Sequence, residues 1–259
     1  MTRESGVGSR GSEESVDSFE RTLIIAPHPD DETIAAGGLI QRAIAAGGEV
    51  RIVFVTDGEN NPWPLRYLKK KLRISGADLA EWGALRRMES LRGLAALGAP
   101  PETAIFLAYP DAMLTRMARA GDFRVRHSLA AAIDGFAPSL LVLPSSFDLH
   151  ADHRAISWQA HAAASGRNVV TYVIHGHAPQ GRLAFRLDLS AEEIARKRAA
   201  IECHQSQLVL SRQRFLSYAK PVEEFCEAEF DVARLDSLMH EWGCSLKHAI
   251  HAVTNSGRA

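Results

Sequence analysis

The hydrophobic pattern of the chain alternates between short apolar runs and longer amphipathic segments. An apolar run at 21–26 is followed by an alanine-rich segment with helical spacing at 34–46, and a second apolar run occupies 49–56. Short runs of this kind predict buried strands, and the segment between them predicts a helix that ends at the Gly47-Gly48 pair. A strand, a helix and a strand within about 35 residues indicate a βαβ unit with parallel strands.

The same alternation continues along the chain. Further strands are predicted at 104–107, 139–143, 169–174, 183–187 and 223–230. Further helices are predicted at 78–97, 116–136, 153–164, 191–207 and 232–242, and the polar segment 60–75 is interpreted as a long loop or a broken helix. We therefore expect a disordered lead at 1–20 and a single α/β domain at 21–259. This domain would be Rossmann-like, with a mostly parallel sheet flanked by helices and a less regular C-terminal elaboration from about residue 211.

Composition and charge narrow the class of protein further. The chain has 259 residues, of which 46% are hydrophobic and 24% charged, as in ordinary globular proteins. A formal net charge of -1 predicts no general attraction to nucleic acid or to an anionic membrane. No apolar run approaches the length of a membrane span, and residues 1–20 lack the apolar core of a secretory signal. Scattered Cys203, Cys226 and Cys244 indicate neither a disulfide framework nor a cysteine zinc site, so we expect a cytoplasmic protein.

Metal-capable side chains gather in two loops that follow predicted strands. "HPDDE" at 28–32 follows the first strand, and "PSSFDLHADH" at 144–153 follows the strand at 139–143. Sites in open parallel sheets form beyond the carboxyl ends of strands. The candidate ligands are His28, Asp30, Asp31, Asp148, His150, Asp152 and His153. Catalytic zinc takes three histidine or carboxylate ligands and keeps a fourth position for water, so the two loops predict a metal-dependent site.

The adjacent carboxylates Asp30 and Asp31 repel each other unless a cation lies nearby. A divalent ion outweighs this repulsion, and neighbouring side chains point in different directions, so one carboxylate can bind metal while the other faces water. Pro29 shapes the turn through its fixed φ. The competing interpretation is a solvated turn or a helix N-terminus. Each loop alone fits both interpretations equally, and the two loops together favour the metal site.

Further motifs match a known family in the same order along the chain. "APHPDDE" at 26–32 and "HADH" at 150–153 resemble the two signature motifs of the PIG-L/LmbE-like family of zinc-dependent N-deacetylases. Additional similar segments are "VTDGE" at 55–59, "RRMES" at 86–90, "YPDAML" at 109–114 and "KRAAIECHQSQ" at 197–207. The chain departs from the family pattern at Pro27, which replaces an alanine or similar residue, and at Ala112, which replaces a glycine.

The resemblance implies a reaction and a set of roles. It implies His28, Asp31 and His153 as ligands of Zn²⁺, or of another divalent metal such as Fe²⁺. It implies Asp30 as the general base that takes a proton from water activated by the metal. The implied reaction removes an acetyl group from an N-acetylated amino sugar of the N-acetylglucosamine type. The implied partner is thus a small-molecule N-acyl amino sugar.

Five further histidine and aspartate side chains are given supporting or structural roles. The resemblance implies His150 as a polarising or acidic histidine that stabilises the oxyanion, with Asp152 as its orienting partner. His175 and His177 alternate at a strand end, and no partner carboxylate lies near them in the sequence, so a structural role is favoured over metal binding. His204 is expected to pack within its helix, near the rim of the site.

Three residues are candidates for substrate contact. Arg86 contacts substrate or, slightly favoured, pairs with Glu89 one helical turn away. Asp111 binds a sugar hydroxyl or only shapes its turn. Trp63 stacks on a sugar ring or anchors its loop in the core. The basic run at 69–71 is expected to be a solvated face, with an anionic lipid or diphosphate substrate as the less favoured interpretation.

Two alternative functions stay open. A zinc amidase acting on a larger acyl or thiol-sugar conjugate would keep the same metal residues and differ in segment 60–75 and in the C-terminal tail. A non-catalytic sugar- or nucleotide-binding Rossmann-like module would bind no metal. Nothing in the sequence names the carrier of the amine, and the aromatic residues of the tail are compatible with a homo-oligomer.

Overall fold

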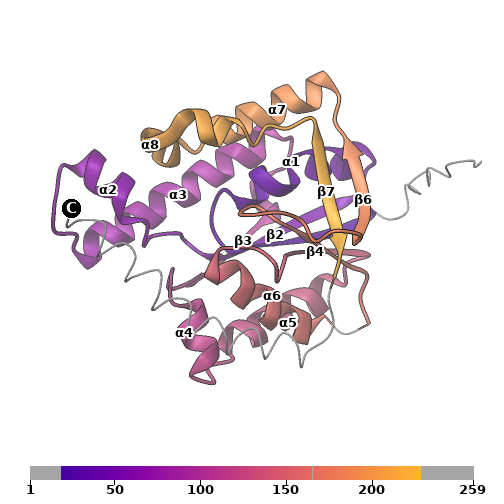
Figure 1. The fold of residues 1–259 in the computed structure, drawn as a ribbon, viewed down its shortest axis with the longest axis horizontal. Coiled ribbons are helices and arrows are strands. Elements are labelled where there is room, and N and C mark those ends of the chain that lie inside the picture. Colours follow the sequence, from indigo (N-terminus) through magenta and orange to yellow (C-terminus); the bar gives the residue numbers. More distant parts are fainter. Residues whose placement is uncertain (1–18, 165, 229–259) are drawn as a thin grey trace, which may run out of the picture.

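A seven-stranded sheet forms the centre of the computed structural model, which describes residues 19–164 and 166–228 (Figure 1). The strands are β1 Arg21–Ala26, β2 Glu49–Thr56, β3 Ala104–Tyr109, β4 Leu140–Pro144, β5 Val169–Tyr172, β6 Leu183–Asp188 and β7 Val222–Glu227. Their order in the sheet is β3-β2-β1-β4-β5-β7-β6. The first five strands in this order pair in parallel, whereas β7 runs antiparallel to both β5 and β6. The predicted α/β class with a mostly parallel sheet is confirmed.

Helices cover both faces of this sheet (Figure 1). They are α1 Asp31–Ala45, α2 Pro62–Lys69, α3 Gly76–Ala96, α4 Leu114–Arg119, α5 Arg124–Phe136, α6 Ala151–Ala163, α7 Ala191–Glu202 and α8 Gln205–Leu216, with a short 3-10 helix at Pro101–Thr103. α1, α3 and α7 lie on one side of the sheet, and α4, α5 and α6 lie on the other. None of these described helices combines the length and the hydrophobicity that a membrane span requires.

The central strand β1 contributes to both layers of the core. Ile24 packs in the cluster beneath α1 and α3, while Leu23 and Ile25 pack in the cluster beneath α5 and α6. All three side chains are fully buried. Successive side chains of a strand point to opposite faces, so a sheet covered on both sides needs a continuous apolar run rather than an alternating one. This is why the sequence of β1 is apolar throughout.

The structure breaks three segments that the sequence pattern joins or leaves irregular. The predicted helix 116–136 is two helices, because Gly121 adopts a φ of 73° and turns the chain between α4 and α5. The predicted helix 191–207 ends at Glu202, and α8 starts after His204, whose ring contacts Thr33 of α1. Segment 60–75 contains α2, which agrees with the broken-helix interpretation. The helix predicted at 232–242 lies outside the described residues, as do residues 1–18 of the predicted disordered lead.

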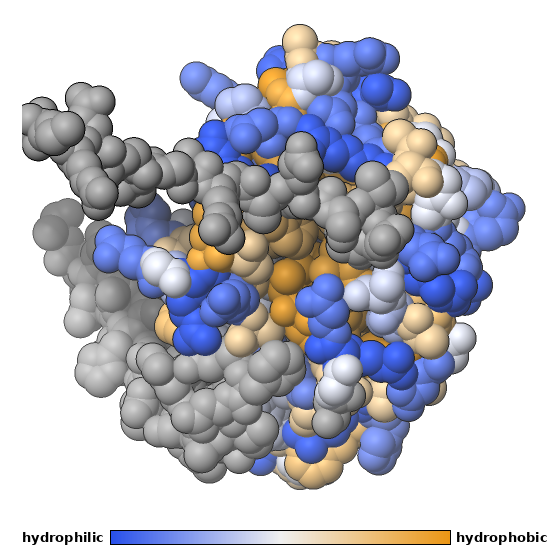
Figure 2. Space-filling view, turned by 90° about the vertical axis from the view of Figure 1, so that its right-hand side faces the viewer, coloured by the Kyte–Doolittle hydropathy of each residue, from blue (hydrophilic) through white to orange (hydrophobic). Residues whose placement is uncertain are grey.

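The parallel strands direct their carboxyl ends to one edge of the sheet. β1 and β4 are neighbours, so the loops that follow them, 27–30 and 145–150, meet there although they are far apart in sequence. The loops after β2, β3 and β5 reach the same edge. At the opposite, β6–β7 end of the molecule, polar side chains cover most of the visible surface around a central area of apolar residues (Figure 2).

Candidate metal-dependent active site

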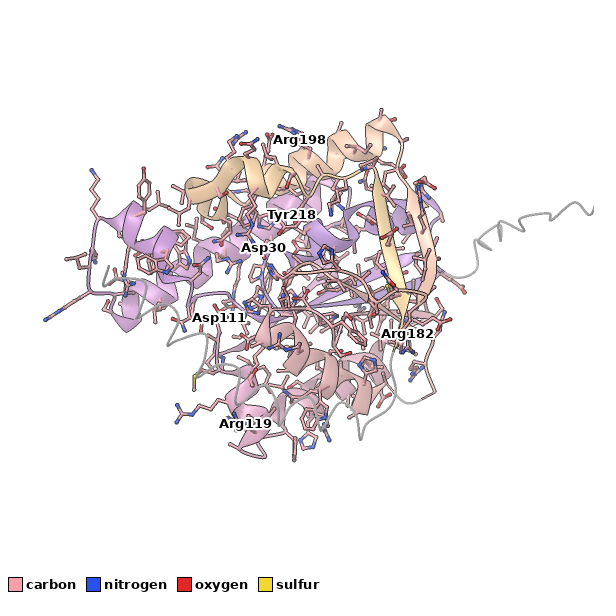
Figure 3. All side chains as sticks on the ribbon, in the orientation of Figure 1. Asp30, Asp111, Arg119, Arg182, Arg198 and Tyr218 are labelled. Carbon is pink, nitrogen blue, oxygen red and sulfur yellow. The ribbon has the colours of Figure 1, made fainter. Side chains whose placement is uncertain are left out.

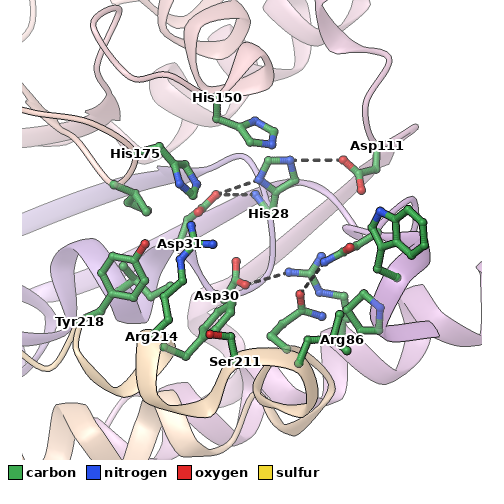
Figure 4. A pocket seen from close by; sticks show the side chains of 18 of the residues that line it. His28, Asp30, Asp31, Arg86, Asp111, His150, His175, Ser211, Arg214 and Tyr218 are labelled. Atoms are coloured by element: carbon green, nitrogen blue, oxygen red, sulfur yellow. Dashed lines mark hydrogen bonds and ion pairs between the residues drawn. The ribbon is translucent and has the colours of Figure 1, made fainter. Parts of the chain in front are cut away.

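The loops at this edge enclose a cavity of about 410 Å³ (Figure 4). Its polar lining includes His28, Asp30 and Asp31 from the loop after β1, Asp111 from the loop after β3, and His150 from the loop after β4. Helix α8 forms another part of the wall. Small-molecule sites commonly have volumes of about 300–1,000 Å³, so the cavity has the size of a small-molecule site.

The turn at the start of α1 is held in an unusual conformation. Asp30 has a φ of 144°, which a residue with a side chain rarely adopts. Its backbone N–H donates to Glu32 Oε2 at 3.0 Å, and its carbonyl accepts from Thr33 Oγ1 at 2.8 Å. Arg86 donates to the Pro29 carbonyl at 2.7 Å. These bonds fix the turn from both sides, and they direct the side chains of Asp30 and Asp31 toward the cavity.

The three residues predicted as metal ligands lie in contact. Asp31 Oδ2 is 3.2 Å from His28 Nδ1 and 3.3 Å from His153 Nε2. His28, His150 and His153 each offer a ring nitrogen, and these atoms lie within 4.8 Å of one another. The His153 ring is fully buried, and neither of its nitrogens makes a well-formed hydrogen bond to a described residue. A buried donor set of this kind fits a divalent cation, which would satisfy the ring nitrogen that faces Asp31.

The electrostatics of this cluster favour positive charge at its centre. Burial by itself lowers the pKa of His153, but Asp31 and Asp148 raise it to about 9. The pKa of His28 is likewise raised by Asp111, Asp152 and Asp31 in spite of burial. Burial raises the pKa of Asp31, yet His153 and His28 hold it well below its usual range. A bound cation would supply the charge that protons supply to the two rings, so the donor set fits a metal.

His28 also belongs to a second group of possible ligands. Its Nε2 lies 3.3 Å from Asp111 Oδ1 and 3.6 Å from Asp152 Oδ2. The His28 contact outweighs burial and lowers the pKa of Asp111 to about 2. Asp111 also accepts the Asn60 N–H at 3.0 Å, so this residue both faces the site and shapes its turn. Ala112, where the family pattern has glycine, takes a φ of 61° and donates its N–H to Asp152.

Asp30 lies beside this cluster, paired with Arg86. The Arg86 Nη2 atom is 3.0 Å from Asp30 Oδ2, and the same guanidinium donates to the Gly58 carbonyl at 2.8 Å. Burial raises the pKa of Asp30 to about 6, although Arg86 opposes the shift. The intrahelical pair predicted between Arg86 and Glu89 is not the contact that forms, because the Glu89 carboxylate accepts two hydrogen bonds from Ser206 instead. Arg86, which also lines the cavity, thus contacts Asp30 rather than Glu89.

The contacts of His150 and Asp152 differ in detail from those expected. His150 caps α6, and its Nδ1 accepts the backbone N–H of Asp152 at 3.3 Å. The Asp152 carboxylate accepts the Ala112 N–H and faces His28, so Asp152 contacts the His150 ring through its main chain. Burial, with the neighbouring His28 and His153, lowers the pKa of His150 to about 4. These surroundings favour a neutral ring, whereas the sequence-based mechanism gave it a proton.

Two residues near the site had no assigned functional role in the sequence analysis. Asp148 was only one of the candidate ligands, and its Oδ2 lies 3.1 Å from His153 Nδ1 while it accepts the His175 N–H. His175 was set aside for lack of a nearby carboxylate, yet it lines the cavity, and its ring centroid is 5.4 Å from that of His153. The strand order brings Asp148 to His175 across 27 residues, which no local pattern reveals.

The structure agrees with only some of the remaining expectations, those for Trp63, His204 and the basic run at 69–71. Trp63 is 68% exposed at the cavity mouth, so it is not a core anchor, and the Arg66 guanidinium lies 5.3 Å from its ring centroid. His204 packs as expected, but fully buried behind the site rather than at its rim, and burial lowers its pKa to about 3. Lys69 pairs with Glu81 on the surface, as a solvated basic run implies.

The fold and this cluster define an α/β protein with a candidate metal-dependent site at the carboxyl edge of its sheet. The family model PIG-L, described as GlcNAc-PI de-N-acetylase, matches residues 23–165. The chain belongs to the PIG-L family.

A curated relative agrees with this membership, and solved structures share the fold. A 1D-myo-inositol 2-acetamido-2-deoxy-alpha-D-glucopyranoside deacetylase of Segniliparus rotundus is 32% identical over 71% of this chain and 52% of its own length. The chain thus spans about half the length of the curated relatives it matches. The antimicrobial A40926 pseudoaglycone deacetylase superposes with a TM-score of 0.62 at 21% identity, covering 81% of this chain and 97% of that one. An N,N′-diacetylchitobiose deacetylase from Pyrococcus horikoshii gives 0.61 at 22% identity, covering 80% and 82%.

Proposed function

We propose that this chain is a metal-dependent hydrolase that removes the acetyl group from an N-acetylated amino sugar of the N-acetylglucosamine type. One observation carries the proposal: the Asp30 carboxylate, with a pKa of about 6, lies in the same cavity as the His28–Asp31 contact. A base poised near neutral pH beside a metal-ligand set is what amide hydrolysis by activated water requires. The names of the relatives support an N-acetyl amino sugar as the substrate.

His28, Asp31 and His153 would hold the metal, which we propose to be Zn²⁺. Their two imidazole nitrogens and one carboxylate also suit another divalent ion such as Fe²⁺. The ion would supply Lewis acidity at the amide carbonyl and would lower the pKa of water. Asp148 would hold the His153 ring in place from the opposite side through the 3.1 Å contact with Nδ1.

The side chains of the cavity would carry the protons of the reaction. Asp30 takes a proton from the attacking water, and Arg86 holds its carboxylate in place during that transfer. His150 Nδ1 accepts the Asp152 N–H, so in the neutral ring Nε2 bears the hydrogen and can donate to the developing oxyanion. Asp30 then returns its proton to the nitrogen as the carbon–nitrogen bond breaks. Acetate and a free amine are the products.

A second candidate is an amidase for a larger acyl or thiol-sugar conjugate. It is favoured by a second hollow of about 460 Å³ along α2, which shares Trp63 and Leu210 with the first cavity. A conjugate longer than one sugar ring would extend past Trp63 into this hollow. As compartment we propose the reducing cytoplasm, since Cys203 and Cys226 are free thiols.

Acetate release by the zinc-loaded full chain tests the proposal. The panel contains N-acetylglucosamine, N,N′-diacetylchitobiose, the 2-acetamido-2-deoxyglucoside of inositol, and the same sugars with longer acyl groups. We expect acetate from at least one member, and loss of about a hundredfold or more in rate for Asp30→Asn. Asp122→Asn, a surface change beside Arg124, is the matched control and should keep the wild-type rate. Release of longer acids only would favour the second candidate, and no release from any member would refute both.

A further inference from the structure

Helix α8 forms a wall of the cavity opposite the metal-ligand cluster. α8 is kinked at Ser211, whose φ of -159° is not helical, and residues from both parts of the helix line the cavity. They are Gln207, Leu210, Ser211, Arg214, Phe215 and Tyr218, the last just beyond the end of α8. Figure 4 shows Ser211, Arg214 and Tyr218 directed toward the cavity that holds Asp30 and Asp31. This wall lies outside the segment 23–165 that matches the family model.

The two arginines that line the cavity differ in their contacts. Arg86 is 3% exposed, and its guanidinium is used by the Gly58 carbonyl, the Pro29 carbonyl and Asp30. Arg214 is exposed to the cavity, and its guanidinium forms no hydrogen bond or ion pair with any residue in 19–164 or 166–228. Among the described residues, Arg214 is therefore the cavity cation whose charge is left for a ligand.

The acidic residues of the cavity already have partners of their own. Asp30 pairs with Arg86, Asp31 contacts two histidines, and Asp111 contacts His28. A guanidinium that no cavity carboxylate neutralises presents a fork of donors suited to the oxygens of phosphate or carboxylate. Tyr218, just beyond the end of α8, lines the same cavity, and its hydroxyl offers a further donor.

The mouth of the cavity is positively charged, like Arg214. Segment 60–77 contains five cations and no acidic residue. Two of the five, Lys69 and Lys71, pair with Glu81 and Asp78 of α3. The second hollow, which shares Trp63 and Leu210 with the cavity, is lined by Lys71 and by two further basic side chains of this segment, Arg66 and Lys70. A basic rim raises the local concentration of anionic ligands and speeds their association.

We propose that α8 binds an anionic group of the substrate, and that Arg214 is the residue that determines this specificity. The substrate class is an N-acyl amino sugar that carries a phosphate or carboxylate substituent. Its amide lies at the His28–Asp30 side of the cavity, and its anionic group bonds to Arg214 and the Tyr218 hydroxyl. This inference rests on the proposed function for the position of the amide, while the anion site itself is testable without turnover.

Binding of product analogues to the zinc-loaded full chain tests the anion site. The probes are glucosamine 1-phosphate, the carboxymethyl glycoside of glucosamine and, as a neutral reference, its methyl glycoside, each titrated by calorimetry. We expect at least one anionic probe to bind about tenfold or more tighter than the neutral one, with a preference that weakens in high salt. Which of the two anions is preferred distinguishes a phosphate from a carboxylate substrate. No preference for either anion would overturn the inference.

Arg214→Gln should abolish the preference for the anion, and Arg214→Lys should keep part of it, because lysine retains the charge but not the fork. Arg212→Gln is the matched control, since Arg212 lies on the same helix, does not line the cavity and pairs with Glu202 at 2.8 Å. The control should bind all probes as wild type does. An undiminished preference in Arg214→Gln would refute the role of Arg214.

Turnover separates this inference from the function on which it rests. With the N-acetyl forms of the three probes, the ratio of kcat/KM for anionic over neutral substrate should fall about tenfold in Arg214→Gln, mainly through KM. Acetate release with a ratio that Arg214→Gln leaves unchanged refutes the inference and keeps the proposed function. Arg214-dependent binding of the anionic probe without acetate release from any substrate refutes the function and keeps the anion site.

Discussion

Asp148 Oδ2 lies 3.1 Å from His153 Nδ1, and both side chains are fully buried. The same carboxylate accepts the N–H groups of Ile174 and His175, so it joins the loop after β4 to the loop after β5. A carboxylate on the outer nitrogen of a ligating histidine fixes the tautomer and the orientation of the ring. Here it leaves Nε2 directed at Asp31, the other proposed ligand.

Asp148→Asn should therefore weaken metal binding by about tenfold to a hundredfold. The physical reason is that the amide lacks the negative charge that faces His153 Nδ1 at 3.1 Å. Zinc affinity is measured by competition with a chromophoric chelator at fixed pH. Asp122→Asn is the control, because that carboxylate pairs with Arg124 at the surface. Equal zinc affinities for the two variants would contradict the orienting role of Asp148.

Removal of Arg86 should shift the acid limb of the rate profile. Burial raises the pKa of Asp30 to about 6, and Arg86 opposes the rise. The carboxyl group therefore loses its proton as the pH increases through about 6, and a cation bound beside it would lower this value. Arg86→Gln removes the opposing charge, and the limb in kcat/KM should move to higher pH. Arg87→Gln, a change to the neighbouring residue that pairs with Asp57, should leave the limb in place. A limb that stays unchanged in Arg86→Gln would disprove the assignment to Asp30.

The stabilisation by metal should change with pH in the opposite direction to the stability of the metal-free protein. Burial lowers the pKa of His153 but its carboxylate neighbours raise it to about 9, compared with about 6.5 in an unfolded chain. A raised folded-state pKa stabilises the metal-free fold fully below pH about 6.5, and this stabilisation is lost as pH rises through about 9. The Tm of chelator-treated protein should thus fall across this window. The increase in Tm caused by zinc should grow with pH, because neutral histidines bind the metal.

His153→Gln provides the comparison for this experiment. The variant should lose most of the zinc-induced increase in Tm and should show a flatter pH dependence in the metal-free state. His177→Gln, at an exposed position, should keep the wild-type slope. A zinc effect that shrinks as pH rises would contradict the proposed ligand set.

A buried ion pair behind the site should contribute more to the free energy of unfolding than a neighbouring pair at the surface. Lys197 Nζ lies 2.6 Å from Glu223 Oε1, and both side chains are only 2% exposed. Glu223 also accepts the Gly38 and Leu39 N–H groups of α1. Lys197→Met leaves the buried carboxylate without its cation, so the free energy of unfolding should fall by about 3–5 kcal/mol.

The adjacent change Arg198→Met serves as the control for Lys197→Met. Arg198 pairs with Glu202 at 3.9 Å on the exposed side of α7, and such pairs contribute about 0–1 kcal/mol. Urea denaturation of the metal-free protein measures both losses on the same scale. Losses of similar size would show that the buried pair has no special role in holding α1.

Several elements were predictable because their apolar patterns reflect which of their faces are buried. β1 and β2 have the bounds that the sequence pattern predicts, since strands covered on both faces are continuous apolar runs. Helix 116–136 was wrong as a single helix, because its apolar spacing continues across Gly121 while the backbone turns there. The end of α7 was missed for a different reason. His204 leaves the helix to reach Thr33, a residue 171 positions away.

The sequence by itself predicted which chemical groups gather at the candidate site. His28, Asp30 and Asp31 lie within four residues, and His150 to His153 within another four, so local spacing was enough to predict two ligand-bearing loops. Their closeness in space followed from the expectation of parallel strands. The sequence did not show which of these side chains pair with each other. Side chains such as Arg86 have several neighbours within reach along the chain.

Only the tertiary structure decided those partners. It paired Arg86 with Asp30 across 56 positions rather than with Glu89, and it brought the Asp148 carboxylate to His153 and to the backbone of His175. It also placed α8, with Arg214, over the cavity. The physical reason is the strand order: β1, β4 and β5 lie side by side, so their loops meet at one edge, and which side chains become buried together depends on that order. Figure 3 shows Asp30, Asp111 and Tyr218, from distant parts of the sequence, toward the middle of the molecule, whereas Arg119 and Arg198 lie toward its outside.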